Sequence, residues 1–185
     1  WVRLTATGEP GHGSRPLGSY ASLGMIEALD RFRRYQFDAR VIPAVDRHFK
    51  GMAERYPEPW RSRFQDLSSA IREPGVLLEL QEYAPGLHTL VRNTCSITRF
   101  GGSEKINVVS PEVWAEIDCR LLPDQDPESW LAELQEVLGP DIEMEVLMGF
   151  TPAVSSIDTG LYETLREVTL ETFPEASFVP QVSGG

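Results

Sequence analysis

The sequence is poor in cysteine, histidine and basic residues, and it has no long apolar run. It contains 185 residues with only 2 cysteines and 3 histidines. Two cysteines are too few to staple a small secreted scaffold. We therefore expect Cys95 and Cys119 to be free thiols in a reduced, cytoplasmic setting. No apolar segment approaches the roughly 18–20 residues that a membrane span requires.

The charge balance is acidic, with 28 acidic against 17 basic residues and a formal charge of −11. Sequence-independent nucleic-acid binding needs a basic face that displaces phosphate counterions, and anionic membranes also attract basic segments. The composition therefore argues against both partners. Hydrophobic residues make up 41% of the chain and include 4 tryptophans and 8 phenylalanines, so we expect a packed core rather than disorder.

Chemical motifs with short spacing are also missing. The histidines His12, His48 and His88 lie far apart, so no self-contained zinc site is predicted. The glycines near His12 and at 101–102 lack the spacing of dinucleotide or phosphate loops. Ser14 has no strand–turn–helix elbow of the kind that exposes a nucleophilic serine. His48 and His88 are interpreted as structural or solvated.

Four segments alternate apolar and polar residues with a period of two, which is typical of half-buried strands. They start near Val2, Thr94, Val113 and Ile142. A helix over about 18–35 and another over 127–138 are expected to cover the apolar side of the sheet. For the first helix the expected apolar side is Tyr20, Leu23, Ile26, Leu29 and Phe32. The order strand, helix, strand, strand, helix, strand predicts an α+β fold, a ferredoxin-like βαββαβ sandwich with an antiparallel sheet.

Two further segments stand outside this pattern. Residues 41–92 are expected to form a helical insertion within a domain that spans 1–149. Residues 150–185 are interpreted as a connector, a helix that ends before Pro174 and a strand over 177–182, which together begin a second domain. The chain opens at Trp1 without an initiator Met, so we expect a segment of a longer protein.

Two groups of polar residues are candidates for chemistry. His12 lies in a loop rich in glycine and proline, so it is either a solvated histidine or a group that stabilises an oxyanion. Asn107 and Arg120 offer an amide and a guanidinium, which together suit recognition of a carboxylate. The alternative is that Arg120 pairs with Asp118 or Glu116 at the surface.

Three blocks of the sequence resemble, in the same order, the dimerisation or lid domain of the dinuclear zinc metallopeptidases. That family includes aminoacylase, acetylornithine deacetylase, succinyl-diaminopimelate desuccinylase and carboxypeptidase S. The blocks are WVRLTATGEPGHGSRP (1–16), NTCSITRFGGSEKINVV (93–109) and EIDCRLLP (116–123). The long insertion is similar to the carboxypeptidase S and N-acyl-amino-acid hydrolase branch. The ending 179–185 resembles the approach to a Gly-Gly-Thr-Asp motif of the catalytic domain.

The resemblance implies a role for several positions. His12 would stabilise the oxyanion in the partner subunit's active site, Asn107 would orient the substrate, and Arg120 would bind the substrate carboxylate, also in trans. Gly101 and Gly102 would shape the turn beside that pocket. The resemblance further implies a homodimer formed through this domain and hydrolysis of N-acyl amino acids or small peptides. The two zinc ions would bind to segments outside this chain, which alone would hold no metal and hydrolyse nothing.

A different class of function shares the same fold and acidity. A non-enzymatic ferredoxin-like module could dimerise or sense a small ligand through the edge of its sheet. An RNA-binding module of this fold is a weaker alternative, since the acidic charge opposes it and no aromatic pair lies on the central strands.

Overall fold

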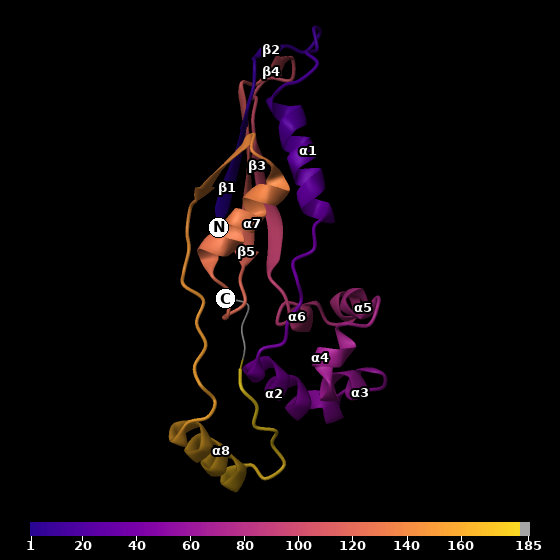
Figure 1. The fold of residues 1–185 in the computed structure, drawn as a ribbon, viewed down its shortest axis with the longest axis vertical. Helices are drawn as coiled ribbons and strands as arrows, with labels where there is room; N and C mark the ends of the chain where they lie inside the picture. The colour runs from indigo at the N-terminus through magenta and orange to yellow at the C-terminus, as the bar shows by residue number, and fades with distance from the viewer. Residues whose placement is uncertain (182–185) are drawn as a thin grey trace. The chain divides into compact units, whose positions relative to one another are not determined.

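The computed structural model describes residues 1–181, which divide into two compact units (Figure 1). The first unit contains residues 1–37, 94–121 and 125–152, and the second contains 38–93, 122–124 and the residues from 153 onward. Within the described residues, no helix combines the length and the apolar character that crossing a membrane would need.

The first unit contains a four-stranded sheet with the strand order β3-β5-β1-β6, and every neighbouring pair is antiparallel. Its strands are β1 (Val2–Thr7), β3 (Thr94–Gly101), β5 (Glu112–Arg120) and β6 (Ile142–Val146). The helices α1 (Ala21–Arg34) and α7 (Pro127–Leu138) pack on one face of this sheet. The expected ferredoxin-like α+β fold is confirmed.

The core of the first unit lies between the helices and the apolar face of the sheet, where Leu4, Ala115 and Leu134 are fully buried. The expected apolar side of α1 is only partly right, because Phe32 is buried and Leu29 packs against the core, whereas Ile26 is 62% exposed. Residues three apart drift by about 60° around a helix at each step, so a stripe of that spacing cannot stay on one face. The residues that α1 buries have spacings of four, three and four: Ala21, Met25, Ala28 and Phe32.

The ends of α7 follow its sequence signals. The carboxylate of Asp126 accepts a hydrogen bond from the backbone N–H of Ser129 at 2.8 Å, and Pro127 takes the first helical position. Gly139 ends the helix with a φ of +90°, a conformation that a residue with a Cβ rarely adopts. Local capping therefore fixes both boundaries of this helix.

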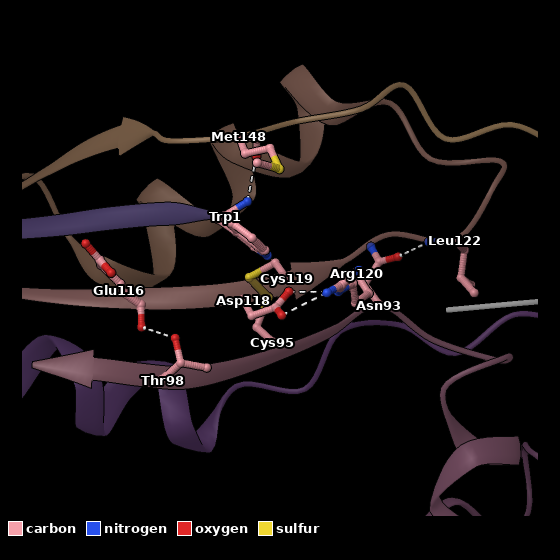
Figure 2. The surroundings of a disulfide bond; sticks show 10 residues. All are labelled: Trp1, Asn93, Cys95, Thr98, Glu116, Asp118, Cys119, Arg120, Leu122 and Met148. Atoms are coloured by element: carbon pink, nitrogen blue, oxygen red, sulfur yellow. Dashed lines mark hydrogen bonds and ion pairs between the residues drawn. A yellow bond between two sulfur atoms is a disulfide. The ribbon is translucent and has the colours of Figure 1, made fainter. Parts of the chain in front are cut away.

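Cys95 and Cys119 form a disulfide, so the expectation of free thiols is wrong (Figure 2). The two residues are directly paired across β3 and β5, and their Cα atoms are 4.1 Å apart. The alternation of side chains placed both on the same face, but composition gave no sign that they bond. Structural disulfides persist mainly in oxidising compartments. The bond therefore removes the argument on which the cytoplasmic expectation rested.

Reduction of this disulfide should destabilise the first unit. The bond closes a loop with a sequence separation of 24 residues. Constraining an unfolded loop of that size is worth about 2–4 kcal/mol. We expect urea unfolding of the chain to shift to lower denaturant with dithiothreitol, and the Cys95→Ser/Cys119→Ser variant to unfold at the shifted midpoint with or without reductant. Two thiols titrating in the native, unreduced chain would contradict this expectation.

The second unit is built from short helices around an aromatic core. Phe49, Phe64 and Leu80 are fully buried at its centre. The helices are α2 (Pro43–Met52), the 3-10 helix η1 (Ala53–Arg55), α3 (Trp60–Gln65), α4 (Leu67–Ala70), α5 (Val76–Tyr83), α6 (Pro85–His88) and α8 (Gly160–Thr172). Asp66 separates α3 from α4 because its side chain accepts a hydrogen bond from the backbone N–H of Ser69, which starts a new helix.

The C-terminal helix and strand have different outcomes. The helix is present as α8, but it buries none of its residues within the described structure. The strand expected over 177–182 does not form over 177–181, and Val182 lies outside the described residues. Pro180 has no N–H to donate to a strand ladder, and its carbonyl oxygen instead accepts a hydrogen bond from Nδ1 of His48 at 2.8 Å. The motif at 182–185 also lies outside the described residues.

Both histidines of the second unit, His48 and His88, are buried, which agrees with their interpretation as structural residues. His48 is held by its bond to Pro180, whereas Nε2 of His88 has no hydrogen-bond partner within the described structure. Burial lowers the pKa of the His88 imidazole, and the positive charge of Arg92 lowers it further. The neutral ring is therefore the form that the folded unit accommodates.

This shift in pKa makes the stability of the second unit dependent on pH. An unfolded histidine binds a proton below about pH 6.5, whereas folded His88 resists protonation. The contribution is therefore fully present above about pH 6.5 and is lost as the pH falls below that value. We expect urea midpoints measured from pH 7.5 down to 5.5 to decline. His88→Gln should flatten the slope, and His12→Gln, which changes an exposed ring, should keep it. Equal slopes in all three chains would contradict the assignment.

Candidate functional site

A short two-stranded arm extends the four-stranded sheet of the first unit (Figure 1). It pairs β2 (Gly11–His12) with β4 (Val108–Val109) in antiparallel register, with His12 opposite Val108. The backbone N–H of Gly13 donates to the carbonyl oxygen of Asn107 at 2.8 Å and continues the ladder. The arm thus brings His12 and Asn107 together, although 95 residues separate them in the sequence.

The hydrogen bonds around His12 select the tautomer of its ring. Nδ1 lies 3.2 Å from the backbone nitrogen of Ser14 and 2.8 Å from its hydroxyl oxygen. A backbone N–H can only donate, so Nδ1 accepts, and the hydrogen of the neutral ring resides on Nε2. Nε2 lies 3.5 Å from the Asn107 side-chain nitrogen, which is also a donor, so the two nitrogens are neighbours rather than hydrogen-bonded partners. Both side chains are exposed, so the arm presents an imidazole N–H donor and an amide at one point.

The arm leaves the sheet through a close approach of backbone to backbone. The N–H of Gly8 donates to the carbonyl oxygen of Pro111 at 2.9 Å, which holds the two chains of the arm together at its base. A Cβ at position 8 would lie 2.6 Å from the backbone nitrogen of Ala21. Only glycine fits there, because the start of α1 blocks any side chain.

Gly101 and Gly102 lie where β3 passes close to β5, just before the chain enters the arm. Neither has a positive φ. A Cβ on Gly101 would overlap the ring of Trp114, and one on Gly102 would lie 3.0 Å from a methyl group of Val113. Packing therefore requires glycine at 101, and the part of both glycines in shaping the turn beside the pocket stays a prediction.

Arg120 lies at the other end of β5 from the arm. Glu112, the first residue of β5, pairs with Thr7 beside the arm, and Arg120, the last, pairs with Thr94. Eight residue steps along a strand span about 27 Å. Within one chain, the structure therefore does not bring Arg120 to His12 and Asn107, and the three do not form the single carboxylate-binding group that their chemistry suggested.

The guanidinium of Arg120 is held by Asp118, as the surface-pair alternative expected (Figure 2). Nε donates to one carboxylate oxygen at 2.7 Å and Nη2 to the other at 2.9 Å. This bidentate bond lowers the pKa of the Asp118 carboxyl and raises that of Arg120, so both groups keep their charges. The pair fixes the orientation of the guanidinium fork at this end of the sheet.

Residues 1–181 contain no cluster of three or more His, Cys, Asp or Glu side chains that could hold a metal ion. The histidines are distributed between the arm and the second unit, and both cysteines are consumed by the disulfide. The described residues therefore do not fit a metal ion.

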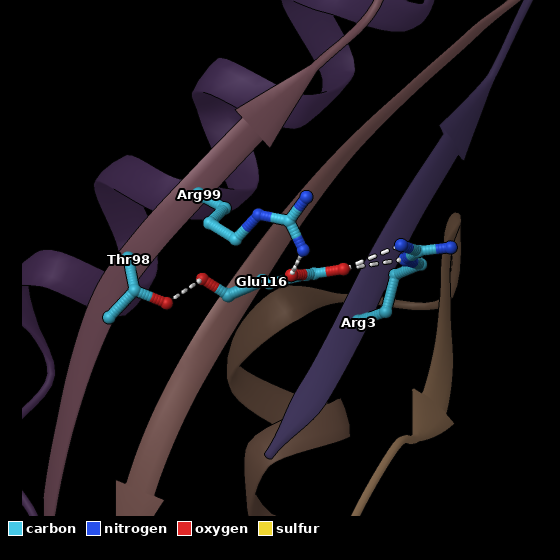
Figure 3. A network of polar contacts seen from close by, with 4 residues as sticks. All are labelled: Arg3, Thr98, Arg99 and Glu116. Atoms are coloured by element: carbon cyan, nitrogen blue, oxygen red, sulfur yellow. Dashed lines mark hydrogen bonds and ion pairs between the residues drawn. The ribbon is translucent and has the colours of Figure 1, made fainter.

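A network that the sequence did not reveal lies on the uncovered face of the sheet. Glu116 is 7% exposed and accepts hydrogen bonds from Arg3 and Arg99 (Figure 3). The alternation of β5 placed Glu116 on the polar face. No local signal indicated that arginines from both flanking strands would enclose it, because the position of Arg99 depends on an irregularity in β3.

The chain contains a domain of a hydrolytic enzyme family. The sequence model of the peptidase dimerisation domain of the M20 family matches residues 1–143, and the chain belongs to this family. It is 31% identical to the mouse N-fatty-acyl-amino acid synthase/hydrolase PM20D1 over 108 residues, which is 56% of this chain and 22% of that protein. It is 27% identical to the Xenopus tropicalis protein over 197 residues, which is 98% of this chain and 36% of that protein.

Solved structures share the fold at low sequence identity. An M20 family metallo-carboxypeptidase from Sulfolobus solfataricus matches the whole chain with a TM-score of 0.57 and 18% identity, over 51% of its own length. Human carnosine dipeptidase 1 matches with a TM-score of 0.56 and 14% identity, over 43% of its length. The chain spans only 22% and 36% of the lengths of the mouse and frog proteins, respectively. Nothing in these comparisons supports a non-enzymatic module.

Proposed function

We propose that this chain is the dimerisation part of a metal-dependent hydrolase that cleaves the amide bond of N-acyl amino acids or small peptides. The observation that carries the proposal is the arm, where the Nε2–H donor of His12 lies beside Asn107 at an exposed position. The names of the curated relatives, which are N-fatty-acyl-amino acid synthase/hydrolases, favour an N-acyl amino acid as the substrate.

In this proposal His12 stabilises the oxygen of the scissile carbonyl as it becomes negatively charged. A neutral imidazole with its hydrogen on Nε2 can donate to that oxygen, and it needs no proton from solution to do so. The amide of Asn107 orients the substrate at the same point. Because both side chains project from an exposed arm, we propose that they serve the reaction centre of a partner subunit in a homodimer.

Arg120 is proposed to bind the substrate carboxylate at a different reaction centre from the one that its own His12 serves. The resemblance to the family implied that both residues act in trans. One small substrate cannot touch two groups about 27 Å apart on one strand. In a two-fold symmetric dimer, however, the arm of one subunit can meet the Arg120 end of the other. Each centre would then take its arm from one subunit and its arginine from the other.

The metal ions, proposed to be zinc, would bind to segments outside this chain. The described residues offer no ligand set, so no step of the reaction is assigned to a metal here. The contribution of this chain is to bind, orient and stabilise charge. We accordingly expect the isolated chain to be inactive, and tests of activity require the whole protein that contains it.

Removal of the His12 imidazole should impair the whole protein strongly. Loss of one preorganised oxyanion donor costs about 100–1,000-fold in kcat. We expect His12→Ala to show this loss with an unchanged unfolding midpoint, because the ring is exposed and its polar neighbours within the described structure are only Ser14 and Asn107. His12→Gln can place an amide N–H near the position of Nε2 and should lose less. Turnover of His12→Ala at the wild-type rate would refute the oxyanion role.

Mixed dimers test how the two ends of β5 are shared between centres. His12→Ala and Arg120→Ala proteins should each be nearly inactive. Their mixed dimer should contain one intact centre, so equal mixing should restore about a quarter of the wild-type rate. A mixture of His12→Ala with Asn107→Ala is the matched control and should restore nothing, because both changes lie on the arm. No recovery in the first mixture would mean that His12 and Arg120 of one chain serve the same centre.

A further inference from the structure

Glu116 is an acidic residue enclosed on the sheet face that α1 and α7 leave uncovered. One carboxylate oxygen accepts hydrogen bonds from Nη2 and Nε of Arg3 on β1, at 2.5 and 3.2 Å. The other accepts from Nη1 of Arg99 on β3, at 2.6 Å. Both guanidinium groups also lie over the ring of Trp114, at 4.8 and 5.3 Å from its centroid. One residue of the central strand thus binds both neighbouring strands.

A bulge in β3 makes this arrangement possible. The register of β3 against β5 shifts between Ile97 and Arg99, so that Arg99 lies opposite Glu116. Without the extra residue, Arg99 would point to the face that the helices cover, because a shift of one residue moves a side chain to the other face. Thr98 fills the irregularity with its hydroxyl, which donates to the backbone oxygen of Glu116 at 3.2 Å (Figure 3).

The network also reaches the point where β3 ends. Trp114 lies two residues before Glu116 on β5 and pairs with Gly101, the last residue of β3. The ring of Trp114 occupies the space that a Cβ of Gly101 would need. Arg3 and Arg99 hold that ring in place by cation–π contacts. The position of Gly101 is therefore tied to the same group that binds β1.

β1 and β3 are the strands whose extensions form the arm, and they are not neighbours in the sheet. β1 leads to His12, and β3 leads through Gly101 to Asn107. We propose that Glu116 is a positioning residue, which sets the placement of His12 relative to Asn107 by fixing both strands to β5. This inference rests on the proposed function, because it assigns Glu116 a part in the reaction to which the arm contributes.

The charges of the network support this role. The hydrogen bond from Arg3 is the main cause that lowers the pKa of the Glu116 carboxyl, and Arg99 adds to it. The carboxylate therefore stays ionised at pH values where an ordinary glutamate begins to take up a proton, and it keeps both charge-assisted bonds. Glu116→Gln has the same shape and leaves the backbone ladders intact, but it replaces these bonds with weaker ones.

A double-mutant cycle in the whole protein tests the proposal. A displacement of about 1 Å at a reacting group can cost on the order of 100-fold, so we expect Glu116→Gln to lower kcat about 10–100-fold with little change in KM. In the His12→Ala background, the same change should cost less than about twofold, because the group that Glu116 positions is already gone. If Glu116→Gln lowers kcat by the same factor in both backgrounds, the positioning role is overturned. An unimpaired His12→Ala protein would instead overturn the proposed function.

The matched control is Asp30→Asn on α1. Asp30 also pairs with two arginines, Arg33 and Arg34, both at 2.7 Å, but it lies on a helix away from the arm. We expect this variant to keep wild-type kcat in both backgrounds. A loss equal to that of Glu116→Gln would show that any broken carboxylate–arginine pair has the same effect, which would overturn the proposal.

Hydrogen exchange of the chain itself provides a readout that does not depend on activity. In Glu116→Gln, the amide of Gly13, which bonds to Asn107, should exchange at least tenfold faster, while the amides that pair β1 with β5 keep their rates. Equal acceleration along β1 and β5 would indicate a merely structural role. If Glu116→Gln fails to fold, Arg99→Ala, which removes only one bond of the network, replaces it in this experiment. It should give the same pattern at Gly13, and an unchanged rate there would overturn the proposal.

Discussion

The register of β5 is the constraint on which the first unit depends. This strand is hydrogen-bonded on both sides, to β1 and to β3, and its alternate residues face the core and the uncovered side. A slip by one residue would bring Glu116 into the core and turn Ile117 away from it, so the register is strongly specified. The base of the arm, the Glu116 network, the disulfide and Arg120 all take their places from this one strand.

Much of the fold could be predicted because its signals are local. Alternation with a period of two located the strands and their apolar faces, and Asp126 with Gly139 bounded α7. The apolar side of α1 was predicted only in part, because the expected stripe included Phe32 but not the small residues Ala21 and Ala28, which pack against the sheet. The strand expected over 177–182 does not form over 177–181, where the Pro180 oxygen accepts a bond from His48. In both places the chain makes tertiary contacts that a local pattern does not show.

The candidate site likewise has features that the sequence predicted and features that it did not. His12 and Asn107 were identified from motifs, and the arm brings them together. Three features could not be predicted from single positions. The bulge at Thr98 turns Arg99 toward Glu116, Trp114 excludes a side chain at Gly101, and Cys95 bonds to Cys119. Each depends on the register between two strands, which composition and periodicity within one strand do not determine.

The arm is also the least supported part of the first unit. Its ladder is only two residues long on each side, and His12, Ile106 and Asn107 are exposed. Fixing the backbone of each residue costs about 1–2 kcal/mol, and little burial at the tip offsets that cost. A donor that stabilises an oxyanion must nevertheless be held in place before the charge develops. In the proposed function, this order would come from two sources, the Glu116 network at the base and a partner subunit that covers the tip. An arm tip with little burial within one chain agrees with membership of a dimerisation family.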